Sequence, residues 1–169
     1  GETHEGRINF EDRYEEATRD LPDELRHDPE DVNLPPFYPV TPEVRRIFAG
    51  MYDLASVFDL KVAEILSWLE EDGDAENTII FVFADHGNGL PRYKRWLNDS
   101  GLRVPLVIYV PPKFRHFRLH KPGSKTDRLV SFVDFPATAI SLAGGDVPDI
   151  LQGKPFMGTT IAEPRQFVY

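Results

Sequence analysis

The run from Thr78 to Ala84 constrains the fold of this chain more than any other feature. It reads Thr-Ile-Ile-Phe-Val-Phe-Ala, lacks polar alternation, and is rich in β-branched and aromatic residues. Such a run is typical of a strand that is buried on both faces, because a solvent-facing side would carry polar residues at every second position. The sequence therefore predicts a strand inside a sheet that has helices on both faces.

A long amphipathic helix precedes this strand. Thr41 is followed by Pro-Glu, which combines a hydroxyl cap with a proline in the first turn, where its missing N–H is tolerated. Apolar residues then recur at alternating steps of three and four positions to about Glu71. Gly73 supplies the left-handed residue at which we expect the helix to end.

Three other segments complete the coarse outline. Residues 104–110 predict a second strand, and residues 130–143 predict a helix that ends at a Gly-Gly pair. Residues 11–40 are acidic and close on several prolines, so we interpret them as an ordered surface loop. Helix, strand, loop, strand and helix in this order predict an α/β fold with a mostly parallel sheet.

Composition excludes several classes of protein. A hydrophobic fraction of 41% is too high for a disordered chain. The absence of cysteine excludes disulfide scaffolds, Cys-ligated metal sites and cysteine nucleophiles. Because no apolar run approaches the roughly 20 residues of a bilayer span, we expect no membrane partner.

Asp85, His86 and Gly87 follow the buried strand directly. In an open α/β sheet, ligands bind at the carboxyl ends of strands, where a rigid strand fixes the position of the loop. A carboxylate and an imidazole at such a point suit a divalent cation. The same residues also fit a simple turn with a capping aspartate, and the pattern alone does not separate the two interpretations.

Residues 92–128 reverse the charge of an otherwise acidic chain. The whole chain has a net charge of -9, whereas this stretch holds ten Lys/Arg and two Asp. Its first cluster, Arg92–Trp96, lies within ten residues of the Asp-His pair and is typical of a site for a tetrahedral oxyanion. A solvated cationic loop is the alternative interpretation.

The basic and aromatic residues 116–120 have neither a second pair of metal ligands nor a recognised nucleic-acid motif. We therefore expect no nucleic-acid partner. We interpret this segment as a mobile loop near the substrate entrance.

The stretch from Tyr52 through Ile108 resembles the C-terminal half of the catalytic domain of the sulfatase family, within the alkaline phosphatase superfamily. The pieces that match in order and spacing are the long helix, Asn77–Phe81, Ala84–Gly87, Lys94 seven residues ahead of Gly101, and Arg103–Ile108. Residues 35–45 resemble the proline-rich approach of bacterial sulfatases related to heparan N-sulfatases. Residues 133–138 and 151–154 resemble the helix and closing loop of the same family.

The resemblance implies a fold and a set of roles. The fold would be a three-layer α/β/α sandwich with a mixed, mostly parallel sheet, of which residues 1–169 form the C-terminal portion of one domain. Asp85 would be a ligand of a divalent metal, Ca2+ in the first place, with Mg2+ or Mn2+ as alternatives. His86 occupies the adjacent ligand position, where many members have Asn. Lys94 matches the lysine that contacts the sulfate, and His4 resembles the histidine that assists the leaving group.

The family's nucleophile is a formylglycine formed within a Cys/Ser-x-Pro-x-Arg motif, and this sequence contains no such motif. A pair of aspartates that completes the metal shell in the family also has no match here. The resemblance therefore implies a fragment that is inactive in isolation. We expect its partners to be a sulfated small molecule or sulfated glycan, and the remainder of the enzyme or a second copy of the chain.

Two alternatives to a sulfatase stay open at this point. The first is a phosphodiesterase or phosphonate monoester hydrolase of the same superfamily, because a metal and a lysine serve phosphoryl and sulfuryl oxygens alike. The second is a noncatalytic polyanion-binding module built around residues 92–128.

Overall fold

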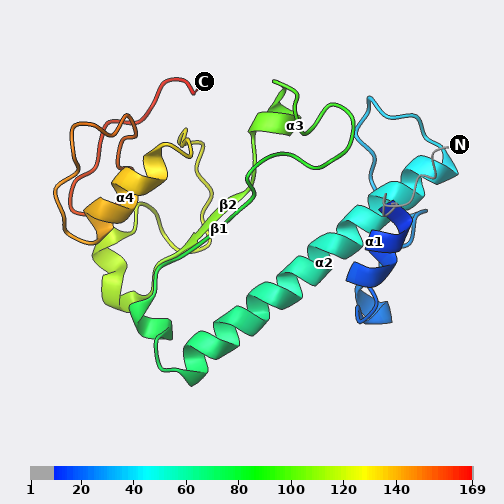
Figure 1. Ribbon diagram of the computed structural model, residues 1–169, viewed down its shortest axis with the longest axis horizontal. Helices are drawn as coiled ribbons and strands as arrows, with labels where there is room; N and C mark the ends of the chain where they lie inside the picture. The colour runs from blue at the N-terminus through cyan, green and yellow to red at the C-terminus, as the bar shows by residue number, and fades with distance from the viewer. Residues whose placement is uncertain (1–9, 169) are drawn as a thin grey trace, which may run out of the picture. The chain divides into compact units, whose positions relative to one another are not determined.

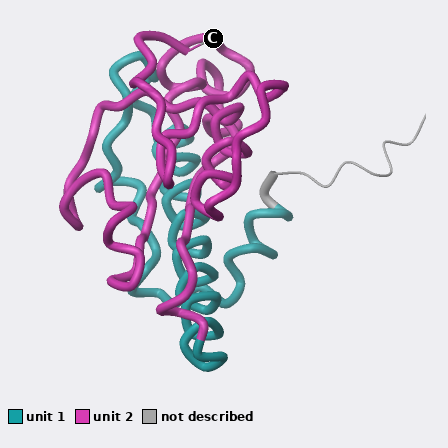
Figure 2. The backbone as a smooth tube through the Cα atoms, turned by 90° about the vertical axis from the view of Figure 1, so that its left-hand side faces the viewer, with its two compact units in different colours: residues 1–73 teal, residues 74–169 magenta. Residues whose placement is uncertain are grey.

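The computed structural model describes residues 10–168, which divide after Gly73 into two compact units, called unit 1 and unit 2 (Figure 2). The elements, shown in Figure 1, are α1 (Phe10–Ala17), η1 (Asp23–Leu25) and α2 (Pro42–Glu71) in unit 1, and η2 (Ala75–Asn77), β1 (Ile80–Phe83), α3 (Asp99–Leu102), β2 (Leu106–Tyr109), η3 (Pro112–Phe117) and α4 (Asp134–Leu142) in unit 2. No helix within residues 10–168 is both long enough and apolar enough to cross a membrane.

Helix α2 confirms the helix predicted from Thr41 to about Glu71. The Thr41 hydroxyl accepts a hydrogen bond from the backbone N–H of Val44 at 3.3 Å, and Pro42 occupies the first turn. Gly73 adopts a φ of +77° just after the helix, the left-handed conformation that a side chain would disfavour.

Helix α1 corrects the interpretation of residues 11–40 as a loop. Its ordering depends on tertiary contacts with α2, which local sequence patterns do not reveal. The Tyr14 ring lies over Gly50, where an added Cβ would be 3.2 Å from the ring. The Tyr14 hydroxyl donates a hydrogen bond to the buried carboxylate of Asp53 at 2.5 Å. Residues 26–41 remain outside regular helices and strands, as expected.

Strands β1 and β2 lie close to their predicted positions and form a two-stranded antiparallel sheet. Phe81 pairs with Ile108, and Phe83 pairs with Leu106. The sequence led us to expect a mostly parallel sheet, but this pair is antiparallel. Residues 84–105 would be long enough for a parallel crossover, but they contain only a four-residue helix and close into a loop whose two arms are hydrogen-bonded to each other. An antiparallel pair is compatible with a mixed α/β sheet, and parallel neighbours remain a prediction.

One face of the sheet packs on the core of unit 2. Val110, Phe156 and Met157 are buried at its centre, and Phe81, Ile108 and Phe135 pack against them with other partly buried residues. Val107 and Tyr109, on the other face, have 62% and 48% of their surface exposed. Strand β1 itself, for which burial on both faces is predicted, is half-buried at Ile80, Phe81 and Val82 and 43% exposed at Phe83. Burial of both faces therefore stays a prediction, and the exposed apolar side chains form a surface suited to further packing.

Asp134 fixes helix α4 to the C-terminal segment. Its carboxylate is almost fully buried and accepts hydrogen bonds from Arg165 Nε at 2.9 Å and Arg165 Nη2 at 2.5 Å. The backbone N–H groups of Lys154 and Ser131 donate to the same carboxylate at 2.7 and 3.0 Å. Four donors on one buried carboxylate join segments that are distant in sequence.

Candidate functional site

The loop of residues 84–105 joins β1 to β2 and carries the predicted metal and sulfate ligands Asp85, His86 and Lys94 (Figure 1). Its base is held closed by backbone hydrogen bonds. The Ala84 N–H donates to the Pro105 carbonyl at 3.4 Å, and the Gly87 N–H donates to the Gly101 carbonyl at 3.2 Å. These bonds place the Asp-His pair directly at the end of the strand, as the sequence predicts.

Two glycines make this close approach of the loop's two arms feasible. A Cβ on Gly87 would lie 2.3 Å from the Ser100 carbonyl oxygen. A Cβ on Gly101 would lie 2.2 Å from the Trp96 carbonyl oxygen and 2.4 Å from that of Tyr93. All three distances are shorter than real contacts of a Cβ atom, so only glycine fits the observed backbone.

The His86 ring is oriented by its neighbours. Nδ1 lies 2.8 Å from the Gly87 carbonyl oxygen. A carbonyl only accepts hydrogen bonds, so Nδ1 carries the proton, and Nε2 of the neutral ring has a free lone pair. Nε2 lies 3.5 Å from Asp85 Oδ2, and the Asp85 side chain is 81% exposed. In this tautomer two acceptor atoms face each other, an arrangement in which both could bind one metal cation.

The Asp85–His86 pair fits part of a divalent metal's coordination shell. A carboxylate oxygen suits Ca2+ or Mg2+, and an imidazole nitrogen suits metals such as Mn2+. At a separation of 3.5 Å, the two side chains would be close enough to hold the same cation. Residues 10–168 contain no group of three or more His, Asp or Glu side chains suited to a metal ion. The pair is therefore compatible with a metal only if further donors complete the shell.

Lys94 is held in the same loop by its backbone. Its N–H donates to the Asn88 carbonyl oxygen at 2.9 Å, which brings it back toward the residues that follow His86. Arg92 and Arg95, on either side, adopt φ values of +68° and +71°. Left-handed conformations are unfavourable for residues other than glycine, and they concentrate at ligand-binding segments. The Lys94 side chain is exposed to solvent.

The structure divides the remaining predicted features. His4, expected to assist the leaving group, lies outside the described residues. Strand β2 divides the basic stretch 92–128, because residues 92–103 belong to the loop before β2 and residues 113–128 follow it. Residues 116 and 117 belong to the 3-10 helix η3, which corrects the interpretation of 116–120 as a loop throughout.

The family assignment follows from comparison with known proteins. Residues 1–145 match the family described as Sulfatase. The chain belongs to the sulfatase family. This confirms the resemblance that the loop motifs and their spacing indicate.

Three relatives illustrate the relationship of this sulfatase chain. It is 37% identical over 137 residues to an ulvan-active sulfatase of Formosa agariphila, covering 81% of this chain and 22% of that protein. It is 32% identical to an N-acetylglucosamine-6-O-sulfatase of Bacteroides thetaiotaomicron, covering 66% and 21%. It is 25% identical to the multifunctional alkaline phosphatase superfamily protein PehA of Trinickia caryophylli, covering 68% and 22%. The chain thus spans about a fifth of the length of these relatives.

Unit 1 of this sulfatase chain contains a second polar feature that sequence patterns did not single out. Asp53 is buried and accepts hydrogen bonds from Tyr14 and from His27, whose backbone N and Nδ1 lie 2.8 and 3.0 Å from Oδ1. Burial by itself raises the pKa of the Asp53 carboxyl, but these hydrogen bonds outweigh it and lower the pKa below its ordinary value. Burial and the bond to Asp53 raise the pKa of Tyr14.

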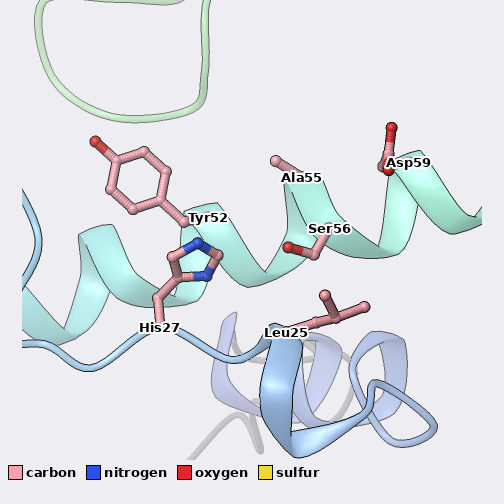
Figure 3. Close-up of a pocket in the computed structure, with 6 residues that line it drawn as sticks. All are labelled: Leu25, His27, Tyr52, Ala55, Ser56 and Asp59. Atoms are coloured by element: carbon pink, nitrogen blue, oxygen red, sulfur yellow. The ribbon is translucent and has the colours of Figure 1, made fainter.

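The His27 ring borders a shallow pocket on unit 1 (Figure 3). The ring lies beside Tyr52, with centroids 5.4 Å apart. The lining residues are Leu25, His27, Tyr52, Ala55, Ser56 and Asp59. The sequence signal that could have identified Asp53 is a carboxylate on the packed face of α2. Its partner His27 could not be identified in this way, because it lies 26 positions away in a segment without a periodic pattern.

Proposed function

We propose that this chain carries part of the active site of a sulfatase that hydrolyses sulfate esters or N-sulfates. The observation that carries the proposal is one loop that presents Asp85, His86 and Lys94 at the end of β1 in a chain of the sulfatase family. The loop provides a carboxylate that would hold a metal and a lysine on the same short segment. A metal and a lysine together can bind a sulfate group and polarise it.

Asp85 and His86 would hold the metal through Asp85 Oδ2 and His86 Nε2. We propose Ca2+, with Mg2+ and Mn2+ as the alternatives, because a carboxylate oxygen favours hard cations. When bound, the metal supplies positive charge that polarises the sulfur–oxygen bonds. The two aspartates that complete the shell in the family would come from sequence beyond these 169 residues.

Lys94 would stabilise the charge that develops on the sulfate oxygens, since its ammonium group donates hydrogen bonds to an oxyanion. His4 would give a proton to the leaving oxygen or nitrogen as its bond to sulfur breaks. The nucleophile would be the hydrated formylglycine of a Cys/Ser-x-Pro-x-Arg motif elsewhere in the protein. Its hydroxyl oxygen would form the new bond to sulfur.

We propose that residues 1–169 form the C-terminal portion of a single three-layer α/β/α domain. The exposed side chains of Val107 and Tyr109 support this proposal, because a covered second sheet face is what such a layer arrangement requires. The remainder of the enzyme, or a second copy of the chain, would cover them. A sulfated small molecule or glycan would be the substrate, in keeping with the names of the ulvan and N-acetylglucosamine relatives.

A phosphodiesterase or phosphonate monoester hydrolase is the second candidate function. This candidate is supported by the similarity of the chain to a multifunctional protein of the alkaline phosphatase superfamily. A site with one metal and Lys94 would serve a sulfuryl group, whereas phosphoryl transfer tends to recruit more positive charge or a second metal. Comparison of kcat/KM for aryl sulfates, phosphate diesters and phosphonate monoesters in the protein with its upstream coding sequence separates the two functions.

The decisive test combines that extended protein with site variants. We expect hydrolysis of an aryl sulfate, and a fall in kcat of about 100-fold or more in Lys94→Ala. Lys61→Ala, which removes an exposed lysine of α2, is the matched control and should retain activity. We expect no turnover by residues 1–169 alone. Sulfatase activity of this isolated chain, or a fully active Lys94→Ala variant, would refute the proposed roles.

A further inference from the structure

The second half of the basic stretch has no role in the proposed active site. From Ser100 to Thr126 the sequence contains no Asp or Glu, yet it contains six Lys/Arg. Five of these cations lie in residues 113–125, here called the basic segment: Lys113, Arg115, Arg118, Lys121 and Lys125. The segment follows β2, whereas the site loop precedes it, so the two groups of cations lie on different segments of the chain.

The beginning of the basic segment is fixed at the far end of the strand pair from the site loop. Figure 1 shows α3, in that loop, at one end of β1 and β2, and the yellow-green η3 at the other. Lys113 Nζ donates to Asn77 Oδ1 at 2.6 Å. Arg118 donates from Nε and Nη2 to the Val110 carbonyl oxygen at 3.1 and 2.8 Å. These bonds anchor the segment just beyond β2.

The chain then returns toward the site loop. Asp127, two residues after the basic segment, lies 3.9 Å from Arg103 Nη2 at the other end of β2. The basic segment therefore runs alongside the sheet between its two ends. The strands have four residues each, which at about 3.3 Å per residue gives a separation of roughly 10 Å or more between those ends. A ligand that follows the segment must be longer than one sulfate group.

The side chains on this path favour ionic binding. Arg115, Lys121 and Lys125 are exposed. Phe114 and Leu119 pack against the core of unit 2 instead of facing solvent. The Phe117 ring lies against Phe114 and His116, at 6.4 and 4.1 Å between centroids. Single-stranded nucleic acids need open aromatic faces for base stacking, whereas a sulfated polysaccharide needs repeated cations.

We propose that the basic segment is a binding track for a sulfated polysaccharide, which leads from η3 to the loop that carries Asp85 and Lys94. Arg115, Lys121 and Lys125 bind sulfate groups along the polymer that are not cleaved. The evidence for the track is the charge and the path of the basic segment. The further claim that the track leads to the sulfate group that is cleaved rests on the proposed sulfatase function.

Heparin binding to the 169-residue chain tests the track, because heparin is a sulfated polysaccharide. The test variant is Arg115→Ala/Lys121→Ala/Lys125→Ala, and the control Arg13→Ala/Arg19→Ala/Lys61→Ala removes three exposed cations of unit 1. By counterion release we expect the test variant to lose about tenfold or more in affinity, and its log–log salt slope to shrink by about two to three. The control should stay within about twofold of the wild type.

Three further measurements separate the track from the proposed function. Asp85→Ala should bind heparin like the wild type, and the test variant, in the extended protein, should hydrolyse a small aryl sulfate normally. The variant should also bind a heparin disaccharide with little change but long heparin more weakly. If sulfatase activity is absent while these binding results hold, the proposed function fails and the track stands.

Several outcomes would overturn the track. Equal losses in the test and control variants would show a general effect of net charge. Loss of heparin binding in Asp85→Ala would place the polymer at the metal site alone. Binding of single-stranded DNA with the same affinity and the same dependence on the three cations would identify a nucleic-acid surface instead. The charge-conserving variant Arg115→Lys/Lys121→Arg/Lys125→Arg should retain heparin affinity, and its failure to do so would also contradict ionic binding.

Discussion

Two aspartates of unit 2 show how differently the same side chain is used in this chain. The Asp134 side chain is 3% exposed and accepts hydrogen bonds from two nitrogens of the Arg165 guanidinium and from two backbone N–H groups. Asp85 is 81% exposed and has one imidazole nitrogen 3.5 Å away. A carboxylate with all its acceptor positions filled holds the fold together, whereas one with vacant acceptor positions can bind a ligand.

Removal of the Asp134 carboxylate gives the largest expected effect. In Asp134→Ala, the partly buried Arg165 loses its carboxylate partner, and two backbone N–H groups lose their acceptor. We expect a loss of about 3–5 kcal/mol in the free energy of unfolding, measured by urea denaturation. A loss below about 1 kcal/mol would show that the Asp134 network is not a structural link.

Gly87→Ala should have the next largest effect, and it concerns the loop that presents Asp85. The new Cβ would meet the Ser100 carbonyl oxygen, so the two arms of the loop must separate at a cost of about 1–3 kcal/mol. Amide hydrogen exchange should accelerate across residues 84–105. Gly89→Ala is the matched control, because a Cβ there has no atom within 4 Å. Equal exchange in the two variants would contradict the close packing of the loop.

Much of the local structure in this comparison could be predicted from sequence. The period of apolar residues and the Thr41 cap located α2, and the apolar run located β1. Asp85 and His86 could be predicted as a pair because they are adjacent in the chain. Their position at the end of a strand could be predicted because they directly follow the apolar run of residues 78–84.

Contacts between distant residues could not be predicted in this way. The Asp134–Arg165 link spans 31 positions, and the contacts that order α1 join it to Asp53, 39 positions beyond Tyr14. Strand direction depends on the loop as a whole, so the antiparallel pairing of β1 and β2 could not be predicted from the apolar runs alone. The division of the basic stretch likewise becomes visible only when β2 is seen to separate its halves.

Acid should weaken the Asp134 link progressively. Burial alone raises the pKa of the Asp134 carboxyl, but the hydrogen bonds from Arg165, Lys154 and Ser131 together lower it below its ordinary value. A lowered pKa in the folded state stabilises the protein above the unfolded-state pKa of about 3.9, and this stabilisation is lost as the pH falls through the folded value.

Thermal unfolding from pH 7 to pH 2 measures this effect. The difference in Tm between the wild type and Asp134→Asn should be constant down to about pH 5 and shrink below about pH 4. Lowering of the Asp53 pKa adds to the acid loss in both proteins, so the difference between them isolates Asp134. A difference that grows in acid would mean that the carboxylate is not the stabilising form.

The smallest effect on stability should come from Asp85→Asn. Because Asp85 is exposed and its nearest partner is an imidazole, the substitution should change the free energy of unfolding by less than about 0.5 kcal/mol without metal. In the extended protein it should instead abolish the rise in Tm on addition of Ca2+, since an amide oxygen is a weaker ligand than a carboxylate. Asp99→Asn, which changes an exposed aspartate of the same loop, should leave that rise in Tm intact.

Two results would contradict this prediction. If Asp85→Asn destabilises the metal-free protein as much as Asp134→Ala does, the functional distinction between the two carboxylates is wrong. If it retains the full response to Ca2+, Asp85 is not a ligand of the metal, and the contrast with Asp134 loses its functional half.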